Sequence, residues 1–204
     1  MFTGLIREMA TVKSFASSTL TLKASYTPKI GDSIAINGAC LTVIRLSNDG
    51  FSVELSPESQ AILAPNTYKG RVHIEPAMQM KDRFEGHVVQ GHIDTTGKIL
   101  SITKQKNSFD VVVSIDKKHH RYIIAKGSVT IDGVSLTINE VFSDSFRLTI
   151  IPHTMKESLF STYSIGSIVN IETDMFARYI EHLLQKSTPS SLSWAEVETI
   201  SAIY

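Results

Sequence analysis

The sequence predicts an all-β protein that is built from two copies of one barrel or sandwich unit. The first observation is an internal repeat: S-I-A-I-N-G-A-C-L-T-V at 33–43 recurs as S-V-T-I-D-G-V-S-L-T-I at 128–138. The second is a series of short, strand-like segments separated by turn residues. The third is that few stretches show a helical pattern. Two halves of roughly 90 residues are each large enough to close a core.

The repeat continues beyond this motif at a constant offset of 95 positions. Phe51 and Pro57 recur as Phe146 and Pro152. A later segment, V-H-I-E from 72, recurs as V-N-I-E from 169 after a small insertion. Agreement in order at several places indicates that one structural unit was duplicated. Within the motif the one chemically distinct exchange is a cysteine, Cys40, for a serine at 135.

Alternating polar and apolar residues, β-branched runs and turn dipeptides predict the strands. In the first half they are expected at 19–22, 33–36, 41–44, 51–55 and 71–75, and in the second at 98–103, 109–115, 129–131, 136–141, 146–151 and 168–172. Asn37-Gly38 and Asp132-Gly133 favour tight turns. A short helix is expected after a proline-terminated strand in each half, at 58–64 and at 154–160.

Two helical patterns follow the second copy. Apolar residues at 175, 176, 179, 180, 183 and 184 have the spacing of an amphipathic helix, and Asp174 is placed to cap its start. S-W-A-E at 193–196 has the form of a capping box, which predicts a last helix with Trp194, Val197 and Ile200 on one side. This last helix has no counterpart in the first half. We expect it to pack on the barrels or on another subunit.

Composition argues against several classes of protein. The chain has 20 basic and 20 acidic residues and no long run of either sign, so neither nucleic acid nor an anionic membrane surface is expected as a partner. A single cysteine excludes an intrachain disulfide and a multi-cysteine metal site. No signal peptide and no apolar run of membrane-spanning length is visible, so a cytoplasmic protein is expected.

Candidate chemistry lies between the halves and in the repeated motif. The segment E-G-H-V-V-Q-G-H-I-D at 85–94 offers His92 as a general acid or base, whereas we interpret His87 as a linker histidine that bonds to backbone. Two histidines at this spacing make only a weak zinc motif. In a strand, Cys40 and Thr42 point to one side, as do their counterparts at 135 and 137. Such pairs suit a polar heterocyclic ligand or an ordinary exposed strand face, and the residues alone leave both open.

The opening M-F-T-G-L-I, the pair N-G-A-C-L-T-V and D-G-V-S-L-T-I, and G-H-V-V-Q-G-H-I-D together resemble the riboflavin synthase family over residues 1 to about 180. The resemblance implies two tandem six-stranded Greek-key barrels, at 1–86 and 87–186, and a C-terminal helix at 187–204 that helps form a homotrimer with active sites between subunits. The implied reaction is a dismutation of two 6,7-dimethyl-8-ribityllumazine molecules into riboflavin and 5-amino-6-ribitylaminouracil. It uses no cofactor and no metal. Lumazine synthase is a further partner that the resemblance suggests.

The resemblance also implies two substrate pockets. The first would use Gly4, Leu5, Ile6, Cys40, Leu41, Thr42, Glu54, Leu55, Ser56, Pro57, Glu58, Ser59, Gly91, His92 and Ile93. The second would use Lys126, Ser135, Leu136, Thr137, Thr149, Ile150, Ile151, Pro152, His153 and Thr154.

Catalytic roles are expected at a few of these positions. His92, or Ser135 with Thr137, would transfer the proton of the acidic 7-methyl group. Cys40 or a water would activate the acceptor ring. Asp174 would orient Ser135 or a water, and Phe2 would help to close the pocket. The alternative is a lumazine- or flavin-binding antenna protein of the same fold that does no chemistry, and the presence of these polar residues in both halves favours the enzyme.

Overall fold

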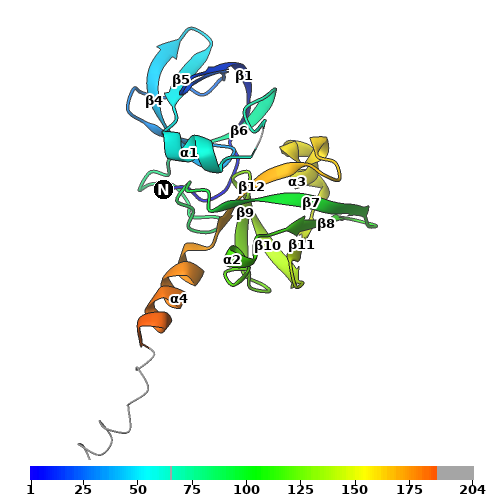
Figure 1. Cartoon of the computed structure of the whole chain (residues 1–204). Coiled ribbons are helices and arrows are strands. Elements are labelled where there is room, and N and C mark those ends of the chain that lie inside the picture. The colour runs from blue at the N-terminus through cyan, green and yellow to red at the C-terminus, as the bar shows by residue number, and fades with distance from the viewer. Residues whose placement is uncertain (65, 188–204) are drawn as a thin grey trace, which may run out of the picture.

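Two closed, antiparallel β-barrels follow one another along the chain in the computed structural model, which describes residues 1–64 and 66–187 (Figure 1). The first barrel consists of β1 (Glu8–Ala16), β2 (Thr19–Lys23), β3 (Ser33–Ile36), β4 (Ala39–Ser47), β5 (Gly50–Glu54) and β6 (Arg71–Pro76). The second consists of β7 (Thr95–Lys104), β8 (Phe109–Ser114), β9 (Ser128–Ile131), β10 (Val134–Val141), β11 (Ser145–Ile150) and β12 (Ile168–Thr173).

The two barrels have the same topology. Around the first barrel the strands run β1-β2-β5-β4-β3-β6, and around the second the corresponding strands follow in the same cyclic order. The central hairpins also share their register, since Cys40 pairs with Ala35 and Ser135 pairs with Thr130. The predicted fold class, two six-stranded barrels related by duplication, is confirmed.

Each barrel has its own hydrophobic core. Alternate strand residues point inward, and the largest fully buried side chains include Phe51, Leu20 and Ile74 in the first barrel and Phe146 and Ile131 in the second. The strand β1 was not predicted from the sequence. Beyond Val12 its residues are exposed, so this half of the strand lacks the alternation by which strands are recognised.

Short helices lie between strands in both halves of the chain. Ser56 caps α1 (Pro57–Ile62) by accepting a hydrogen bond from the Ser59 amide, so this helix begins and ends slightly earlier than predicted. The second predicted helix is two elements, α3 (Pro152–Glu157) and a 3₁₀ helix, η1 (Leu159–Thr162), because Ser158 ends the first and caps the second. The basic run at 117–121 forms a one-turn helix, α2 (Lys117–His120).

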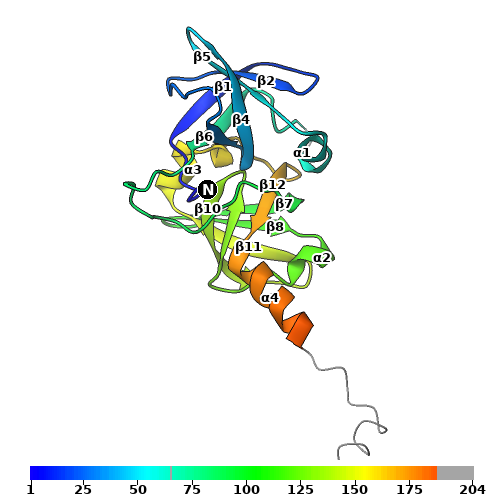
Figure 2. The ribbon, with the colours of Figure 1, turned by 90° about the vertical axis from the view of Figure 1, so that its left-hand side faces the viewer.

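The amphipathic helix α4 (Met175–Ser187) projects away from the second barrel in both views (Figures 1 and 2). Exposed apolar side chains lie along it, at Phe176, Tyr179, Ile180, Leu183 and Leu184. The predicted last helix with Trp194, Val197 and Ile200 lies outside the described residues. Among the helices that the structure describes, none is long and apolar enough to cross a membrane.

The two copies of the repeated motif meet where the barrels touch. A Cβ atom added to Gly38 would lie 2.8 Å from the Gly133 amide nitrogen, and one added to Gly133 would lie 2.8 Å from the Gly38 amide nitrogen. Side chains bond across this contact: the buried His73 ring shares hydrogen bonds with the Asp132 carbonyl (2.8 Å) and the Leu159 amide (2.8 Å). The close glycine contact and these bonds set how one barrel sits on the other.

Candidate active site

Two chain segments outside the barrels cross between them. Residues 1–6 precede the first barrel, and residues 87–93 connect the two. They pair as a short antiparallel bridge, in which the Phe2 amide donates to the Val89 carbonyl (2.8 Å) and the Val89 amide donates to the Phe2 carbonyl (3.1 Å). We call these segments the first and second arm. The two arms reach opposite barrels, and each carries the sequence G-x-I, as Gly4-Leu-Ile and Gly91-His-Ile.

The second arm lies on the first barrel at Cys40. The Cys40 amide donates to the Gly91 carbonyl at 2.8 Å. Gly91 has φ of +80°, and a Cβ atom there would lie 2.6 Å from the Cys40 Cβ, so only glycine permits this approach. A cavity of about 400 Å³ opens beside it, which we call the Cys40 pocket. Its lining residues are Ala39, Cys40, Ser56, Glu58, Ser59, Ile62, Leu63, Gly91, His92 and Ile93.

The first arm lies on the second barrel at Ser135 in the same way. The Ser135 amide donates to the Gly4 carbonyl at 2.8 Å. Gly4 has φ of +76°, and a Cβ atom there would lie 2.6 Å from the Ser135 Cβ. The two sites are therefore equivalent positions of a duplicated structure, with a thiol in one and a hydroxyl in the other. We call the second one the Ser135 site.

A buried glutamate anchors each arm. Glu75 on β6 accepts hydrogen bonds from the Thr3 amide (2.8 Å), the Thr3 hydroxyl (2.9 Å) and the Gly4 amide (3.0 Å). Glu172 on β12 accepts from the amides of Gln90 (2.7 Å), Gly91 (2.8 Å) and His92 (3.1 Å). These two glutamates are the final residues of the repeated V-H-I-E and V-N-I-E segments. Burial raises the pKa of both carboxyl groups, that of Glu172 to about 7.

The Ser135 site also contains a histidine. His87 Nδ1 and Ser135 Oγ form a hydrogen bond at 2.7 Å, and the His87 ring is buried. Burial lowers the pKa of His87, and the negative charge of Asp174 opposes this effect. The imidazole is thus held in the neutral form near neutral pH, in which one ring nitrogen can accept a proton. Asp174 itself accepts a hydrogen bond from the Phe176 amide (2.7 Å) at the start of α4, as its predicted capping role requires.

Several sequence predictions are corrected by this geometry. Gly4, Leu5 and Ile6 were assigned to the pocket of Cys40, but Gly4 lies against Ser135 and Ile6 packs on the second core, because the arms cross. His87 was interpreted as bonding to backbone, yet its ring bonds to the Ser135 hydroxyl. His92 lines the cavity at Cys40 together with Gly91 and Ile93, in the pocket to which the sequence assigned it.

For other predicted residues, the alternation along their strands decides whether the side chain points into a barrel core or outward. The side chains of Leu41, Leu55 and Ile150 point into the barrel cores, and none of the three lines the Cys40 pocket. Thr42 and Thr137 are exposed on the outer faces of β4 and β10. Thr42 pairs across the sheet with Glu54.

The remaining predicted residues, most of them from the second pocket, have different surroundings. Leu136 packs partly against the second core. Thr149 donates a hydrogen bond to Asp110 at 2.8 Å. Exposed residues are Lys126, Ile151, Pro152 and His153, with Thr154 half-buried in α3, and Pro57 is exposed at the start of α1.

The sequence held signals for the residues that were missed. The glutamates of V-H-I-E and V-N-I-E recur at equivalent positions, although a strand glutamate is ordinarily solvent-exposed. The G-x-I pattern was visible in both arms. Nothing local to His87 marks it, because its partner Ser135 is 48 residues away in sequence. Among residues 1–64 and 66–187, no three His, Cys, Asp or Glu side chains cluster in a way that would hold a metal ion.

Comparison with known proteins shows similarity along most of the chain. The sequence matches the lumazine binding domain family twice, at residues 3–77 and 90–174. It is 42% identical to riboflavin synthase of Actinobacillus pleuropneumoniae over 195 residues, covering 91% of each protein. It is 39% identical to riboflavin synthase of Photobacterium phosphoreum over 199 residues, covering 93% of this chain and 91% of that protein. The fold resembles that of LumP complexed with riboflavin, with a TM-score of 0.75, 21% identity, and coverage of 85% of this chain and 99% of that one.

Proposed function

This chain belongs to the riboflavin synthase family with its two lumazine binding domains, and from that premise we propose how its two sites perform the reaction. The enzyme catalyses the dismutation of 6,7-dimethyl-8-ribityllumazine. One molecule gives a four-carbon unit to a second, which yields riboflavin and 5-amino-6-ribitylaminouracil. The alternative of a non-catalytic antenna protein receives less support, because the likeness to LumP is at 21% identity and concerns the fold alone.

The duplication is the observation that carries the proposal. A reaction between two identical molecules needs two similar binding sites, and the Cys40 pocket and the Ser135 site are equivalent in strand, register and glycine contact. Holding two reactants in contact contributes roughly 7 kcal/mol or more to lowering the barrier. We propose that each site binds one lumazine, with the ring beside the glycine carbonyl and the strand-borne thiol or hydroxyl.

The two sites differ in chemical capacity. At the Ser135 site, the neutral His87 ring accepts the serine proton, so that the serine oxygen can in turn accept a proton from the acidic 7-methyl group. Asp174 stabilises the imidazolium that forms. At the Cys40 pocket, the thiol or a water adds to the acceptor ring, and His92 is available for proton transfer. General acid–base groups of this kind accelerate reactions by roughly 10²–10⁴-fold.

We propose a homotrimer in which the first barrel of one subunit faces the second barrel of a neighbour. The exposed apolar side chains of α4, with Phe176 at 56% and Ile180 at 57% exposed, support a subunit contact along this helix. A site shared between subunits would also shield the bound rings from water. The cytoplasmic location and an association with lumazine synthase are further proposals.

A direct assay tests the function. Purified protein is mixed with 6,7-dimethyl-8-ribityllumazine, and riboflavin formation is followed by its absorbance. Turnover supports the enzyme, whereas a tightly bound and unchanged chromophore supports the antenna protein. The assigned roles are tested with Ser135→Ala, His87→Ala, His92→Ala and Asp174→Ala. Near-normal turnover in all four would contradict the role assignments while leaving the overall activity established.

A further inference from the structure

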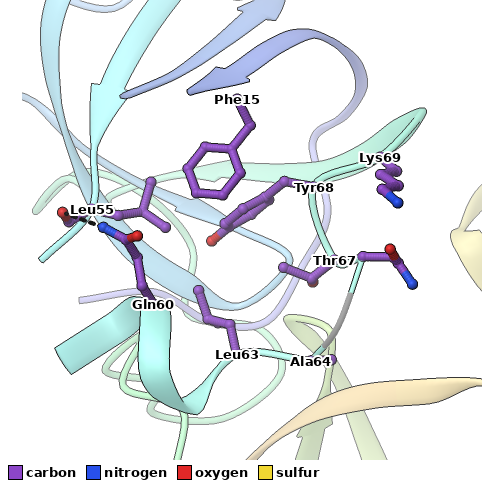
Figure 3. Close-up of a pocket in the computed structure, with 9 residues that line it drawn as sticks. Phe15, Leu55, Gln60, Leu63, Ala64, Thr67, Tyr68 and Lys69 are labelled. Atoms are coloured by element: carbon purple, nitrogen blue, oxygen red, sulfur yellow. Dashed lines mark hydrogen bonds between the residues drawn. The ribbon is translucent and has the colours of Figure 1, made fainter. Parts of the chain in front are cut away.

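A second cavity of the first barrel has about 460 Å³ of space and lies beside α1 (Figure 3). Phe15, Leu55 and Leu63 give it apolar walls, and Gln60, Tyr68 and Lys69 supply polar groups. Its volume is in the range of small-molecule sites. Neither Cys40 nor either glycine arm lines it, so it is distinct from the Cys40 pocket.

The hydroxyl of Tyr68 is the unusual feature of this cavity. Tyr68 is 5% exposed, and its hydroxyl oxygen is buried without a hydrogen-bond partner among the described residues. Figure 3 shows the hydroxyl pointing toward Leu55 and Gln60. Leaving a buried hydroxyl without a hydrogen bond is energetically costly, so such groups generally have a partner. Burial raises the pKa of Tyr68, so the phenol retains its proton and can donate.

The duplicated barrel provides an internal comparison. The counterpart of Tyr68 in the repeat is Tyr163, whose hydroxyl donates to Asp132 at 2.6 Å. Both rings make an edge-to-face contact, Tyr68 with Phe15 (centroids 5.4 Å apart) and Tyr163 with Phe160 (5.3 Å). Each ring thus has an edge-to-face aromatic neighbour, at non-equivalent positions, but among the described residues only the Tyr163 hydroxyl has a polar partner.

The Tyr68 hydroxyl has no partner in the described part of the chain because the equivalent of Asp132 is engaged elsewhere. That equivalent is Asn37, whose amide nitrogen donates to the Thr67 carbonyl (2.7 Å) and whose amide oxygen accepts from the His73 amide (2.8 Å). The Tyr68 hydroxyl therefore faces a cavity in the first barrel, whereas the equivalent Tyr163 hydroxyl in the second barrel is hydrogen-bonded to Asp132.

The charge around the cavity indicates the kind of ligand. Lys69 is its one charged lining residue, and the described lining residues include no aspartate or glutamate. Phe15 is 43% exposed, although it is a large aromatic side chain. An aromatic ring would cover Phe15, an acceptor on that ring would pair with Tyr68, and a carboxylate would be attracted to Lys69.

We propose that this cavity binds a small aromatic carboxylate whose ring also carries a hydrogen-bond acceptor. The ring lies against Phe15, the Tyr68 hydroxyl donates to the acceptor, and the carboxylate lies near Lys69. Since Leu63 lines both this cavity and the Cys40 pocket, α1 and the residues after it form a common wall. Occupancy is therefore expected to change the KM of the enzyme for lumazine without competing for its site.

Three probes test the chemistry by calorimetric titration of the full chain. They are 6-hydroxy-2-naphthoate, 2-naphthoate, which lacks the acceptor, and 6-hydroxy-2-naphthamide, which lacks the charge. Binding of the first is expected to weaken about tenfold in Tyr68→Phe, the loss of one hydrogen bond. The same variant is expected to bind 2-naphthoate as the wild type does. Lys69→Met should weaken the binding of the two carboxylate probes and leave the binding of the amide probe unchanged.

Two controls separate a ligand site from a structural effect. Neither Tyr68 nor Lys69 lies in the substrate machinery, so basal turnover should be unchanged in both variants. Tyr68→Phe should keep or raise the stability of the free protein, whereas Tyr163→Phe should lower it by removing a satisfied bond. The proposal is overturned if the wild type binds no probe at millimolar concentration, if neither variant weakens binding, or if 6,7-dimethyl-8-ribityllumazine displaces the probe competitively.

Discussion

The contact between each arm glycine and the opposite barrel can be tested by adding a single methyl group. In Gly91→Ala the new Cβ would lie 2.6 Å from the Cys40 Cβ and 3.0 Å from Phe2 Cε2. Carbon atoms normally approach to about 3.5–4.0 Å. The arm must therefore move away from the strand, or the strand must yield.

The expected loss of stability has two parts. Alanine at a positive φ costs about 1–2 kcal/mol at any such position. Overpacking of a tight contact adds about 1–3 kcal/mol. Gly31 provides the matched control, because its φ is +91° and no atom of the residues that the structure describes lies within 4 Å of an added Cβ. Gly31→Ala should lose stability through the positive φ alone, whereas Gly91→Ala should lose stability through both the positive φ and the overpacking.

Urea unfolding at one fixed protein concentration measures both variants, and lumazine turnover gives the functional readout. A displacement of the arm near 1 Å is expected to reduce turnover by up to about 100-fold in Gly91→Ala, with Gly31→Ala unchanged. Gly4→Ala should behave like Gly91→Ala, since its Cβ would lie 2.6 Å from the Ser135 Cβ. Equal losses of stability in Gly91→Ala and Gly31→Ala would refute the reasoning.

Three further predictions concern charge and chemistry at the two sites. Burial raises the pKa of Glu172 from 4.5 to about 7, so between these values the folded chain retains a proton that the unfolded chain has lost. Stability should fall as pH rises through this window, by roughly 3 kcal/mol, and Glu172→Gln should lack that slope in urea titrations at several pH values. His87→Ala should reduce turnover by roughly 10²-fold or more and change its pH profile, whereas an unaltered profile would exclude His87 from proton transfer. Cys40→Ser and Ser135→Cys should impair turnover unequally, and equal effects would mean that the two sites have no division of labour.

The duplication could be read from the sequence because it depends on local patterns. Alternation, turn dipeptides and the recurring motif are all encoded within a few neighbouring residues. They predicted two copies of one barrel or sandwich unit, the turns at Asn37 and Asp132, and the equivalence of Cys40 and Ser135, whereas the choice of barrels came from the family resemblance. They also predicted that Thr42 and Thr137 point to the same side of their strands as Cys40 and Ser135, because strand side chains alternate with a period of two.

The pairing of arms with barrels was decided by the tertiary structure alone. Gly4 is close in sequence to the first barrel, yet it contacts Ser135 of the second, because a chain segment outside a barrel is directed by its long-range hydrogen bonds. Those bonds run to Glu75 and from the Ser135 amide for the first arm, and to Glu172 and from the Cys40 amide for the second, so each arm bridges the two barrels. For the same reason the partner of His87 could not be inferred from its neighbours in the chain.

The surroundings of the Tyr68 hydroxyl are a further feature that only the tertiary structure decides. The sequence shows that Tyr68 and Tyr163 are equivalent, but only the folded structure shows that, within residues 1–64 and 66–187, the Tyr163 hydroxyl has a partner and the Tyr68 hydroxyl has none. Sequence thus determined the duplicated barrels and the candidate side chains on their strands. The three-dimensional packing decided which of those side chains meet, because hydrogen bonds and close contacts between distant residues leave no periodic trace in the chain.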